Sequence, residues 1–178
     1  MISLRELHEK DAPFMIEWMH DPDNQRWFKK DMLGTSIENV KSFCLSSKIP
    51  KLIKNGDNLH FAIVDESDEY LGTVSLKSID FDNMTAEYAI ATRKKARGRG
   101  VATAATYELL KKAFIDYELH RVYLNVFSNN IPAIKLYERC GFKFEGEFRE
   151  HLRINGKFVN WKWYGILAKE FCQSDSLY

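Results

Sequence analysis

The chain has 178 residues, of which 45% are hydrophobic, 13% aromatic and 29% charged. This composition indicates one globular domain spanning residues 1–178, and it excludes a disordered or fibrous protein. The net charge of +1 gives no general attraction to nucleic acid or to an anionic membrane, so any charge-based function requires local clusters.

A short strand and two helices are expected in the N-terminal third of the chain. Residues 2–7 alternate weakly, and a helix is expected to start at residues 11–13, where an aspartate precedes an alanine and a proline. Its apolar stripe consists of Phe14, Met15, Trp18 and Met19. Residues 21–24, DPDN, are expected to break this helix. Residues 35–38, TSIE, fit a capping box at the start of a second helix, whose apolar face is Val40, Phe43 and Cys44.

The middle of the chain is predicted to contain a three-stranded meander and then a long helix. Strands are expected over residues 59–64, 70–79 and 84–92, separated by short polar turns. A basic, glycine-containing segment, residues 93–100, precedes a helix over residues 101–116. The core face of this helix is expected to be Ala105, Leu109, Leu110, Ala113 and Phe114.

The C-terminal part alternates strand and helix before it ends in a hairpin. A strand is expected over residues 121–127, a short helix over residues 131–140, and strands from residue 142 and over residues 158–168. The Asn-Gly pair at residues 155–156 is a strong hairpin signal. Strand–helix–strand units imply parallel pairing, whereas the meander and the hairpin imply antiparallel pairing. We therefore expect an α/β protein with a mixed sheet and helices on both faces.

Cysteine and histidine usage predicts neither a disulfide framework nor a metal site. Cys44, Cys140 and Cys172 are far apart and odd in number, and the five histidines lack metal-ligand spacing. We expect free thiols in a reducing cytoplasm and no bound metal. The N-terminus has no secretory pattern, and no apolar run approaches the roughly 20 residues of a membrane helix, so we expect a cytoplasmic protein with no membrane partner.

The segment KARGRGVAT, residues 95–103, lies between a predicted strand and a predicted helix. A helix N-terminus presents unpaired N–H groups and partial positive charge, and glycines allow a pyrophosphate to approach the backbone closely. The nearby basic side chains add charge for further phosphate groups: Arg93, Lys94, Lys95, Arg97 and Arg99. A P-loop is excluded because GxxxxGK is missing, and a Rossmann fingerprint fits poorly. A solvated loop and a nucleic-acid patch remain alternatives.

Two segments together resemble the GCN5-related N-acetyltransferases. The first matches the family's acetyl-coenzyme A signature at Gly98 and Gly100, although Lys95 replaces the usual glutamine or arginine. The second, NIPAIKLYERCGF at residues 130–142, resembles the family's Asn-x-x-Ala-x-x-Leu-Tyr-x-x-x-Gly-Phe helix. The resemblance covers residues 59–168 well and the N-terminal part only in outline. It implies a mostly antiparallel sheet of six to seven strands.

The resemblance implies where acetyl-CoA, as co-substrate, would bind. Its pyrophosphate would be held by Arg97, Gly98, Arg99, Gly100, Val101, Ala102 and Thr103. Its pantetheine arm would lie along the strand at Ala89, Ile90, Ala91 and Thr92, mostly on backbone groups, where an N–H polarises the thioester carbonyl. Asn130 and Ala133 on the second signature would complete the contacts.

The resemblance also implies a general acid at Tyr137. Attack of an amine on the thioester expels coenzyme A as a thiolate, and a phenol with a pKa of about 10 can protonate a thiolate with a pKa of about 8.5 when the two are aligned. The helix alone favours a packed aromatic on an apolar face for Tyr137, whereas the two signatures together favour the acid role. Glu87 is the candidate base or the ligand of a cationic substrate, with a structural ion pair as the alternative reading, and His120 is a weaker candidate base.

The acceptor pocket in this family is built from the N-terminal helices, their loop and the last hairpin. Trp27 and Phe28 are the candidate substrate contacts there, and further aromatic and acidic residues lie in the same segments: Trp18, Trp161, Trp163, Tyr164, Asp21, Asp23, Glu145 and Glu147. A core position is the alternative reading for each tryptophan. The pattern is similar to the branch of ribosomal-protein N-terminal and spermidine acetyltransferases, and the Trp27 loop also resembles amino-sugar nucleotide acetyltransferases.

The sequence therefore predicts transfer of acetyl from acetyl-CoA to a primary amine by direct attack in a ternary complex. The acceptor is a small-molecule or peptide amine and stays open between a polyamine, a protein N-terminus and an amino-sugar nucleotide. A catalytically inactive acetyl-CoA-binding module is the alternative function. A nucleic-acid-binding role would give steep salt dependence and is not expected as a partner class, whereas a homodimer is compatible with the sequence.

Overall fold

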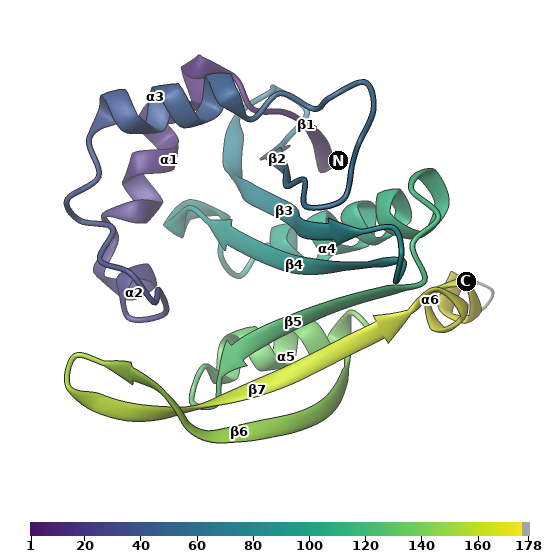
Figure 1. The fold of residues 1–178 in the computed structure, drawn as a ribbon. Helices are drawn as coiled ribbons and strands as arrows, with labels where there is room; N and C mark the ends of the chain where they lie inside the picture. The colour runs from purple at the N-terminus through teal and green to yellow at the C-terminus, as the bar shows by residue number, and fades with distance from the viewer. Residues whose placement is uncertain (176–178) are drawn as a thin grey trace.

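The computed structural model describes residues 1–175, with side chains described to residue 171. Seven strands form one sheet: β1 (Ser3–Glu6), β2 (Leu59–Val64), β3 (Tyr70–Asp80), β4 (Thr85–Thr92), β5 (Arg121–Phe127), β6 (Lys143–Ile154) and β7 (Lys157–Leu167). The helices are α1 (Ala12–Met19), α2 (Pro22–Gln25), α3 (Ile37–Ser46), α4 (Val101–Lys111), α5 (Ile131–Arg139) and α6 (Ala168–Asp175). Figure 1 shows their arrangement.

The strand order in the sheet is β1-β2-β3-β4-β5-β7-β6. Every neighbouring pair is antiparallel except β4 with β5, which run parallel because α4 connects them. The predicted mixed, mostly antiparallel sheet of six to seven strands is therefore confirmed, with seven strands.

The parallel pairing between β4 and β5 is short. It consists of three residue pairs, Thr85 with Arg121, Ala86 with Val122 and Glu87 with Tyr123. In contrast, β4 stays paired with β3 up to Thr92, and β5 stays paired with β7 up to Phe127. Beyond Glu87 the two central strands separate, and Figure 1 shows their ribbons diverging toward α2.

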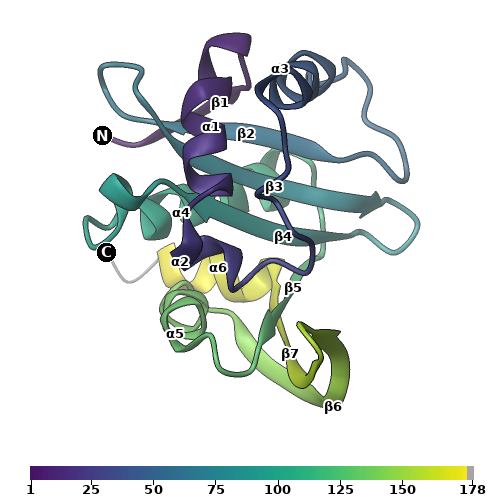
Figure 2. The same ribbon diagram turned by 90° about the vertical axis from the view of Figure 1, so that its left-hand side faces the viewer.

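Each face of the sheet packs its own hydrophobic core (Figures 1 and 2). Because side chains alternate along a strand, β2 directs Phe61 and Ile63 to one face and Ala62 and Val64 to the other. The larger core joins the sheet to α4, α5 and α6, and the smaller core joins it to α1 and α3. All five residues predicted for the core face of the long helix are buried, and the predicted helices on both faces are confirmed.

Both predicted helix caps near the N-terminus need correction. The carboxylate of Asp11 does not cap α1; it accepts a hydrogen bond from the His8 N–H at 2.8 Å and pairs with Arg5 at 2.7 and 2.9 Å. Helix α3 is capped by Ser36, whose hydroxyl accepts from the Asn39 N–H, so the predicted box of residues 35–38 begins one residue early. Phe14 is 39% exposed and lies outside the core stripe.

Three elements differ from their predicted form. Residues 21–24 do not simply end α1, because they begin the short helix α2, capped by the Asp21 carboxylate. The long helix ends at Lys111 and continues as a π-helical turn, Lys112–Asp116. Helix α6 follows β7 directly and was not predicted, although its Phe171 is buried in the larger core.

The cysteines with described side chains, Cys44 and Cys140, are buried free thiols, and burial raises the pKa of each to about 11. The side chain of Cys172 lies outside the described residues. Within residues 1–175, the helices are all too short or too polar to cross a membrane.

Candidate active site

A cavity of about 740 Å³ opens where β4 and β5 separate. The main predicted catalytic, cofactor and substrate contacts line it except Arg99: Trp27, Phe28, Glu87, Ala89, Ile90, Ala91, Thr92, Arg97, Gly98, Gly100, Val101, Ala102, Thr103, Asn130, Ala133 and Tyr137. These residues come from the loop after α2, from β4, from the segment that leads into α4 and its first turn, and from α5. The divergence of two strands thus brings together segments that are distant in the sequence.

The edge of β4 that faces the cavity carries free backbone groups. The Arg93 N–H donates to the Leu71 carbonyl at 2.9 Å, and backbone direction alternates along an antiparallel pair. The groups of Ala89 and Ala91 therefore point to β3, whereas those of Ile90 and Thr92 point to the cavity. The Thr92 carbonyl accepts from the Asn24 side chain at 3.3 Å. The two alanines contribute small side chains, and the polar groups come from Ile90 and Thr92.

The start of α4 has the geometry of an anion site. Gly98 and Gly100 have φ of 72° and 74°, the left-handed region in which glycine is favoured. Gly100 caps α4 and no side chain caps it, so the N–H groups of the first turn, Val101 to Thr103, have no intrahelical acceptor. A Cβ at either glycine would meet no atom within 4 Å and would occupy the open cradle. These features fit a pyrophosphate.

The basic side chains near the cradle mostly hold the protein together. Arg93 is 7% exposed and binds Glu17 at 2.6 Å and Glu69 at 3.0 Å, so it is not available to phosphate. Arg97 donates to the Asp21 carboxylate at 2.5 Å, and Lys95 pairs with Glu69. The prediction that all five basic residues supply charge for phosphate groups is therefore wrong for Arg93.

The remaining two, Lys94 and Arg99, are exposed and form no ion pair with any described residue. Arg97 anchors the cradle to α2, because its guanidinium also donates to the Asn24 side-chain oxygen at 2.8 Å. Burial acts to raise the pKa of Asp21, but hydrogen bonds from the Asp23 N–H and from Arg97 outweigh it and lower the pKa.

Tyr137 is both packed and part of the cavity wall. Its ring is 9% exposed and lies edge-on to Tyr88 at 5.8 Å and to Phe142 at 6.1 Å. Its hydroxyl has no hydrogen-bond partner among the residues that the structure describes. Burial, with a smaller contribution from Cys140, raises the pKa of Tyr137. The phenol is therefore protonated at neutral pH and can act as a proton donor.

The Asn130 side chain has a structural use as well as a place in the cavity wall. Its Oδ1 accepts from the Ala133 N–H at 3.3 Å and thereby caps α5. Its amide N–H groups are left as donors for another partner.

Glu87 stands at the point where β4 and β5 part. Its Oε1 accepts from the Lys77 ammonium at 3.0 Å, and both side chains are about a quarter to a third exposed, at 23% and 35%. Its register partner on β5 is Tyr123, whose pKa is raised by burial and by the Glu87 charge. Glu87 thus forms an ion pair and lines the cavity. His120 does not line it, and its backbone instead links Met84 to Ala168.

Aromatic side chains from the loop after α2, from β5 and from β7 form another part of the cavity wall. The ring centroids of Trp27 and Phe127 are 6.5 Å apart, and those of Phe28 and Trp18 are 5.8 Å apart. Trp161, which is 9% exposed, also lines the cavity and lies under the Lys29 ammonium, 3.6 Å from its ring centroid. Burial lowers the pKa of Lys29, whereas the Glu87 carboxylate acts in the opposite direction.

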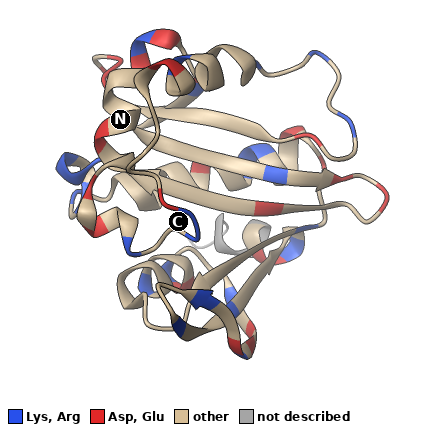
Figure 3. Ribbon diagram, turned by 60° about the vertical axis from the view of Figure 1, so that its left-hand side comes forward, with Lys and Arg blue, Asp and Glu red and all other residues tan. Residues whose placement is uncertain are grey.

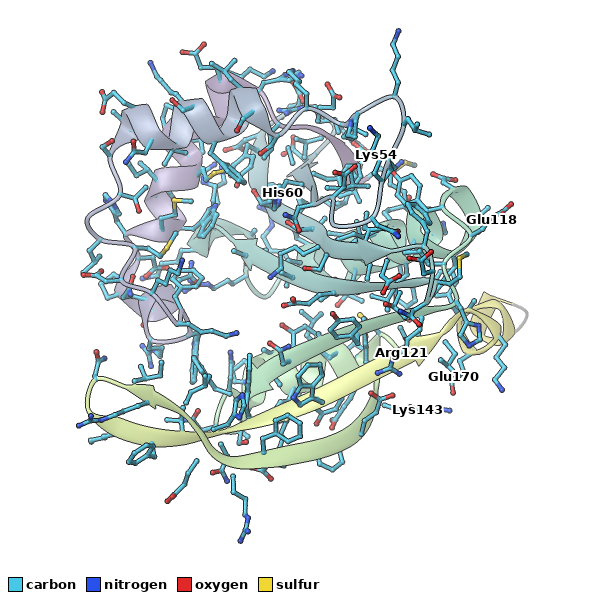
Figure 4. All side chains as sticks on the ribbon, in the orientation of Figure 1. Lys54, His60, Glu118, Arg121, Lys143 and Glu170 are labelled. Atoms are coloured by element: carbon cyan, nitrogen blue, oxygen red, sulfur yellow. The ribbon has the colours of Figure 1, made fainter. Side chains whose placement is uncertain are left out.

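Several residues predicted near the acceptor are used elsewhere. Trp163 does not line the cavity but stacks on Tyr123 at 5.7 Å. Glu145 pairs with Arg121, which Figure 4 labels beside the Lys143–Glu170 pair, and Glu147 accepts from Ser128 at 2.6 Å. Of the predicted acidic residues Asp21, Asp23, Glu145 and Glu147, only Asp23 lines the cavity.

Some residues of the cavity wall were not predicted: Asn24, Lys29, Asn125, Phe127, Arg139 and Trp161 as a contact of Lys29. Asn24 lies in the polar segment that was interpreted as a helix break. Its hydrogen bond to Thr92 joins two residues that are distant in the sequence. No local sequence pattern could have predicted this contact, because it depends on tertiary packing.

Comparison with known proteins agrees with this geometry. The model of the acetyltransferase (GNAT) domain matches residues 2–143. A spermidine N(1)-acetyltransferase of Vibrio cholerae serotype O1 is 30% identical over 176 residues, which cover 96% of this chain and 95% of that protein. A putative ribosomal N-acetyltransferase of Bacillus subtilis is 34% identical over 100 residues, covering 56% and 55% of the two chains.

Solved structures show the same fold. The crystal structure of spermidine N-acetyltransferase from Vibrio cholerae in complex with CoA and spermine superposes with a TM-score of 0.83 at 25% identity, covering 96% of this chain and 98% of that one. An acetyltransferase of the GNAT family from Bacillus anthracis has a TM-score of 0.81 at 20% identity, covering 95% and 96%.

Proposed function

The chain belongs to the GNAT acetyltransferase family and is an N-acetyltransferase, and from this premise we propose that acetyl-CoA is its donor and that a primary amine attacks the bound thioester directly, in a ternary complex. One observation carries the proposal. A single cavity is lined by both signature segments and by the free edge of β4. Acetyl-CoA supplies the thioester, whose carbonyl carbon is attacked and whose sulfur leaves as a thiolate.

The protein's groups for holding the donor are mainly backbone groups. The unpaired N–H groups of the first turn of α4 face a cradle kept open by Gly98 and Gly100, and they bind the pyrophosphate. The N–H and carbonyl of Ile90 and the N–H of Thr92 bind the extended arm, as a neighbouring strand would. An N–H on this edge polarises the thioester carbonyl.

Tyr137 acts as the general acid. Its phenol donates a proton to the departing sulfur, because the aromatic packing against Tyr88 and Phe142 fixes the ring in the cavity wall. Burial keeps the phenol protonated, since it raises the pKa of Tyr137 above the ordinary value. The group therefore remains in its acid form over the whole pH range in which an amine acceptor becomes deprotonated.

Glu87 acts on the amine. A primary ammonium has to lose a proton before it attacks, and Glu87 is the cavity carboxylate at the strand separation. Lys77 holds the carboxylate in place at 3.0 Å. Glu87 thus orients the ammonium and accepts its proton, directly or through water. The Vibrio cholerae relative named above is a spermidine acetyltransferase and the Bacillus subtilis relative a putative ribosomal one. The acceptors to compare are a polyamine, a peptide N-terminus and an amino-sugar nucleotide.

The first test is acetyl transfer by the purified protein to a pool of these amines, followed by mass spectrometry, with Tyr137→Phe as the diagnostic variant. We expect kcat to fall about 100-fold, because the leaving sulfur loses its proton donor, while the Kd for CoA stays within about twofold. Tyr117→Phe is the matched control, because Tyr117 is a half-buried tyrosine outside the cavity, and its turnover should not change.

Unchanged turnover in Tyr137→Phe would remove this residue from the mechanism. CoA binding without acetylation of any amine in the pool would instead support the inactive, acetyl-CoA-binding module. Failure of CoA to bind would overturn the proposed use of the cradle.

A further inference from the structure

A second cavity, of about 500 Å³, adjoins the first. It lies between the loop that follows α2 and the tip of the β6–β7 hairpin. The two cavities share a wall made of Arg26, Phe28 and Lys29. A molecule with its amine in the first cavity can therefore extend into the second without leaving the protein surface.

The walls of the second cavity are strongly cationic. Arg26, Lys29, Lys30 and Arg153 face it, against the single carboxylate of Asp31. Figure 3 shows blue segments on both the loop after α2 and the hairpin. Among the described residues, only Arg26 of these cations has a salt-bridge partner, Asp23. Lys29 contacts the ring of Trp161, and the Arg153 guanidinium lies 5.9 Å from the Phe158 ring.

The carboxylates that line the first cavity are already paired. Glu87 binds Lys77 at 3.0 Å, and Asp23 pairs with Arg26 and with Arg97. Beyond the single ammonium that Glu87 orients, a polycation would place its further charges beside Lys29, Lys30 and Arg153, and like charges brought together across a binding surface are strongly unfavourable. The charge of the walls is complementary to an anion.

We propose that the second cavity binds a phosphate or diphosphate group of the acceptor, so that the acceptor is a primary amine that also carries phosphate. The inference rests on the proposed acetyl transfer and specifies its substrate class. Lys30 and Arg153 contact the phosphate oxygens from opposite sides, because a guanidinium and an ammonium both form charge-assisted hydrogen bonds to phosphate. Phe28 and Trp161 offer apolar faces to the part of the acceptor between its amine and its phosphate.

Binding is measured first, with inorganic pyrophosphate as the probe and with the protein saturated with CoA so that the cradle is filled. We expect saturable binding that Lys30→Glu and Arg153→Glu each weaken by at least about tenfold, because each replaces an attraction by a repulsion. Lys54→Glu is the matched control and should bind as the unaltered protein does. Lys54 is exposed on the loop between α3 and β2, and Figure 4 shows it far from the hairpin. Equal binding by all four proteins, or no binding, would overturn the proposal.

Transfer is measured next, with glucosamine, glucosamine 6-phosphate, a nucleoside-diphosphate amino sugar and spermidine. We expect the two phosphorylated amines to have higher kcat/KM than the other two, and we expect Lys30→Glu to reduce this advantage. Comparison of glucosamine 6-phosphate with the nucleoside-diphosphate amino sugar distinguishes a monophosphate from a diphosphate acceptor. A preference of the unaltered protein for spermidine or glucosamine would contradict the proposal. If no amine were acetylated, the proposed acetyl transfer would be contradicted. The pyrophosphate measurement would still test the anion site independently.

Discussion

Gly98 and Gly100 show at the residue scale how backbone conformation prepares a binding site. Both have positive φ, and the Cβ that any other residue would add projects into open space in the cradle. The two glycines therefore serve two requirements, a left-handed backbone and an unobstructed approach to the first turn of α4.

Gly98→Val should reduce CoA affinity at least tenfold, because the branched side chain is strained at this φ and fills the cradle. Gly56→Val is a suitable control, since Gly56 has φ of 88° with open space around its Cβ but lies outside the cavity. We expect calorimetry to show lost affinity only for Gly98→Val, while thermal unfolding shows a similar loss of stability in both. Similar CoA affinity in the two variants would mean that the cradle does not hold the donor.

The sequence was informative about these residues for reasons that also limit it. Glycines at fixed spacing and the motif around Tyr137 depend on local backbone geometry, which a short segment encodes. The charges of Arg93 and Arg97 were predicted to serve phosphate, but Arg93 is consumed by an internal network and Arg97 by α2. Arg93 and Glu17 are more than 70 residues apart in the sequence. No local sequence pattern predicts which carboxylate such an arginine will contact.

Arg93 links several elements around the smaller core. Its guanidinium binds Glu17 on α1, Glu69 before β3 and the Tyr70 carbonyl, at 2.6 to 3.0 Å, and lies 4.6 Å from the Phe14 ring. Because Arg93 directly follows β4, this network fixes α1 against the end of the strand that lines the cavity. The exposed position of Phe14 is also explained, since its ring covers the guanidinium.

Arg93→Met should lower the free energy of unfolding by about 2 kcal/mol, because the buried Tyr70 carbonyl and the Glu17 carboxylate lose their donor and Glu69 keeps only Lys95. Urea unfolding measures the change. Lys111→Met, which removes only an exposed helical pair with Glu108, should change it by less than about 0.5 kcal/mol. Equal effects of the two substitutions would show that the Arg93 network adds nothing beyond a surface pair.

Element order was predictable wherever hydrophobic periodicity was strong. The three strands of the meander, the long helix and the final hairpin appear in the predicted order, and the resemblance to the GNAT family and to its spermidine and ribosomal branches is confirmed. Helix α2 was missed because four residues carry no periodicity. Helix α6 was missed because it begins directly after β7, with no glycine, proline or other turn residue to mark the boundary.

At the scale of the whole molecule, the sheet consists of two parts joined by three residue pairs. The first part is β1 to β4 and the second is β5, β7 and β6. Their separation was not predictable from the sequence, because β4 and β5 each read as an ordinary strand along their whole length. Only the three-dimensional structure shows that the pairing of β4 with β5 ends at Glu87 and Tyr123.

Hydrogen exchange should report this separation. In the protein without ligand, the amides of Ile90 and Thr92 should exchange quickly, whereas those of Ala89 and Ala91, which are bonded to β3, should be protected. CoA should slow exchange at Ile90 and Thr92 at least tenfold and leave the two alanines nearly unchanged. Equal protection at all four amides before CoA is added would mean that the edge of β4 is not free.

The short junction between β4 and β5 has a consequence for the resistance of the protein to proteases. Under the proposed function, acetyl-CoA completes the missing row of hydrogen bonds, and a ligand that binds only the folded protein stabilises it by an amount that grows with the logarithm of ligand concentration above Kd. We therefore expect susceptibility to proteases to rise when acetyl-CoA is scarce.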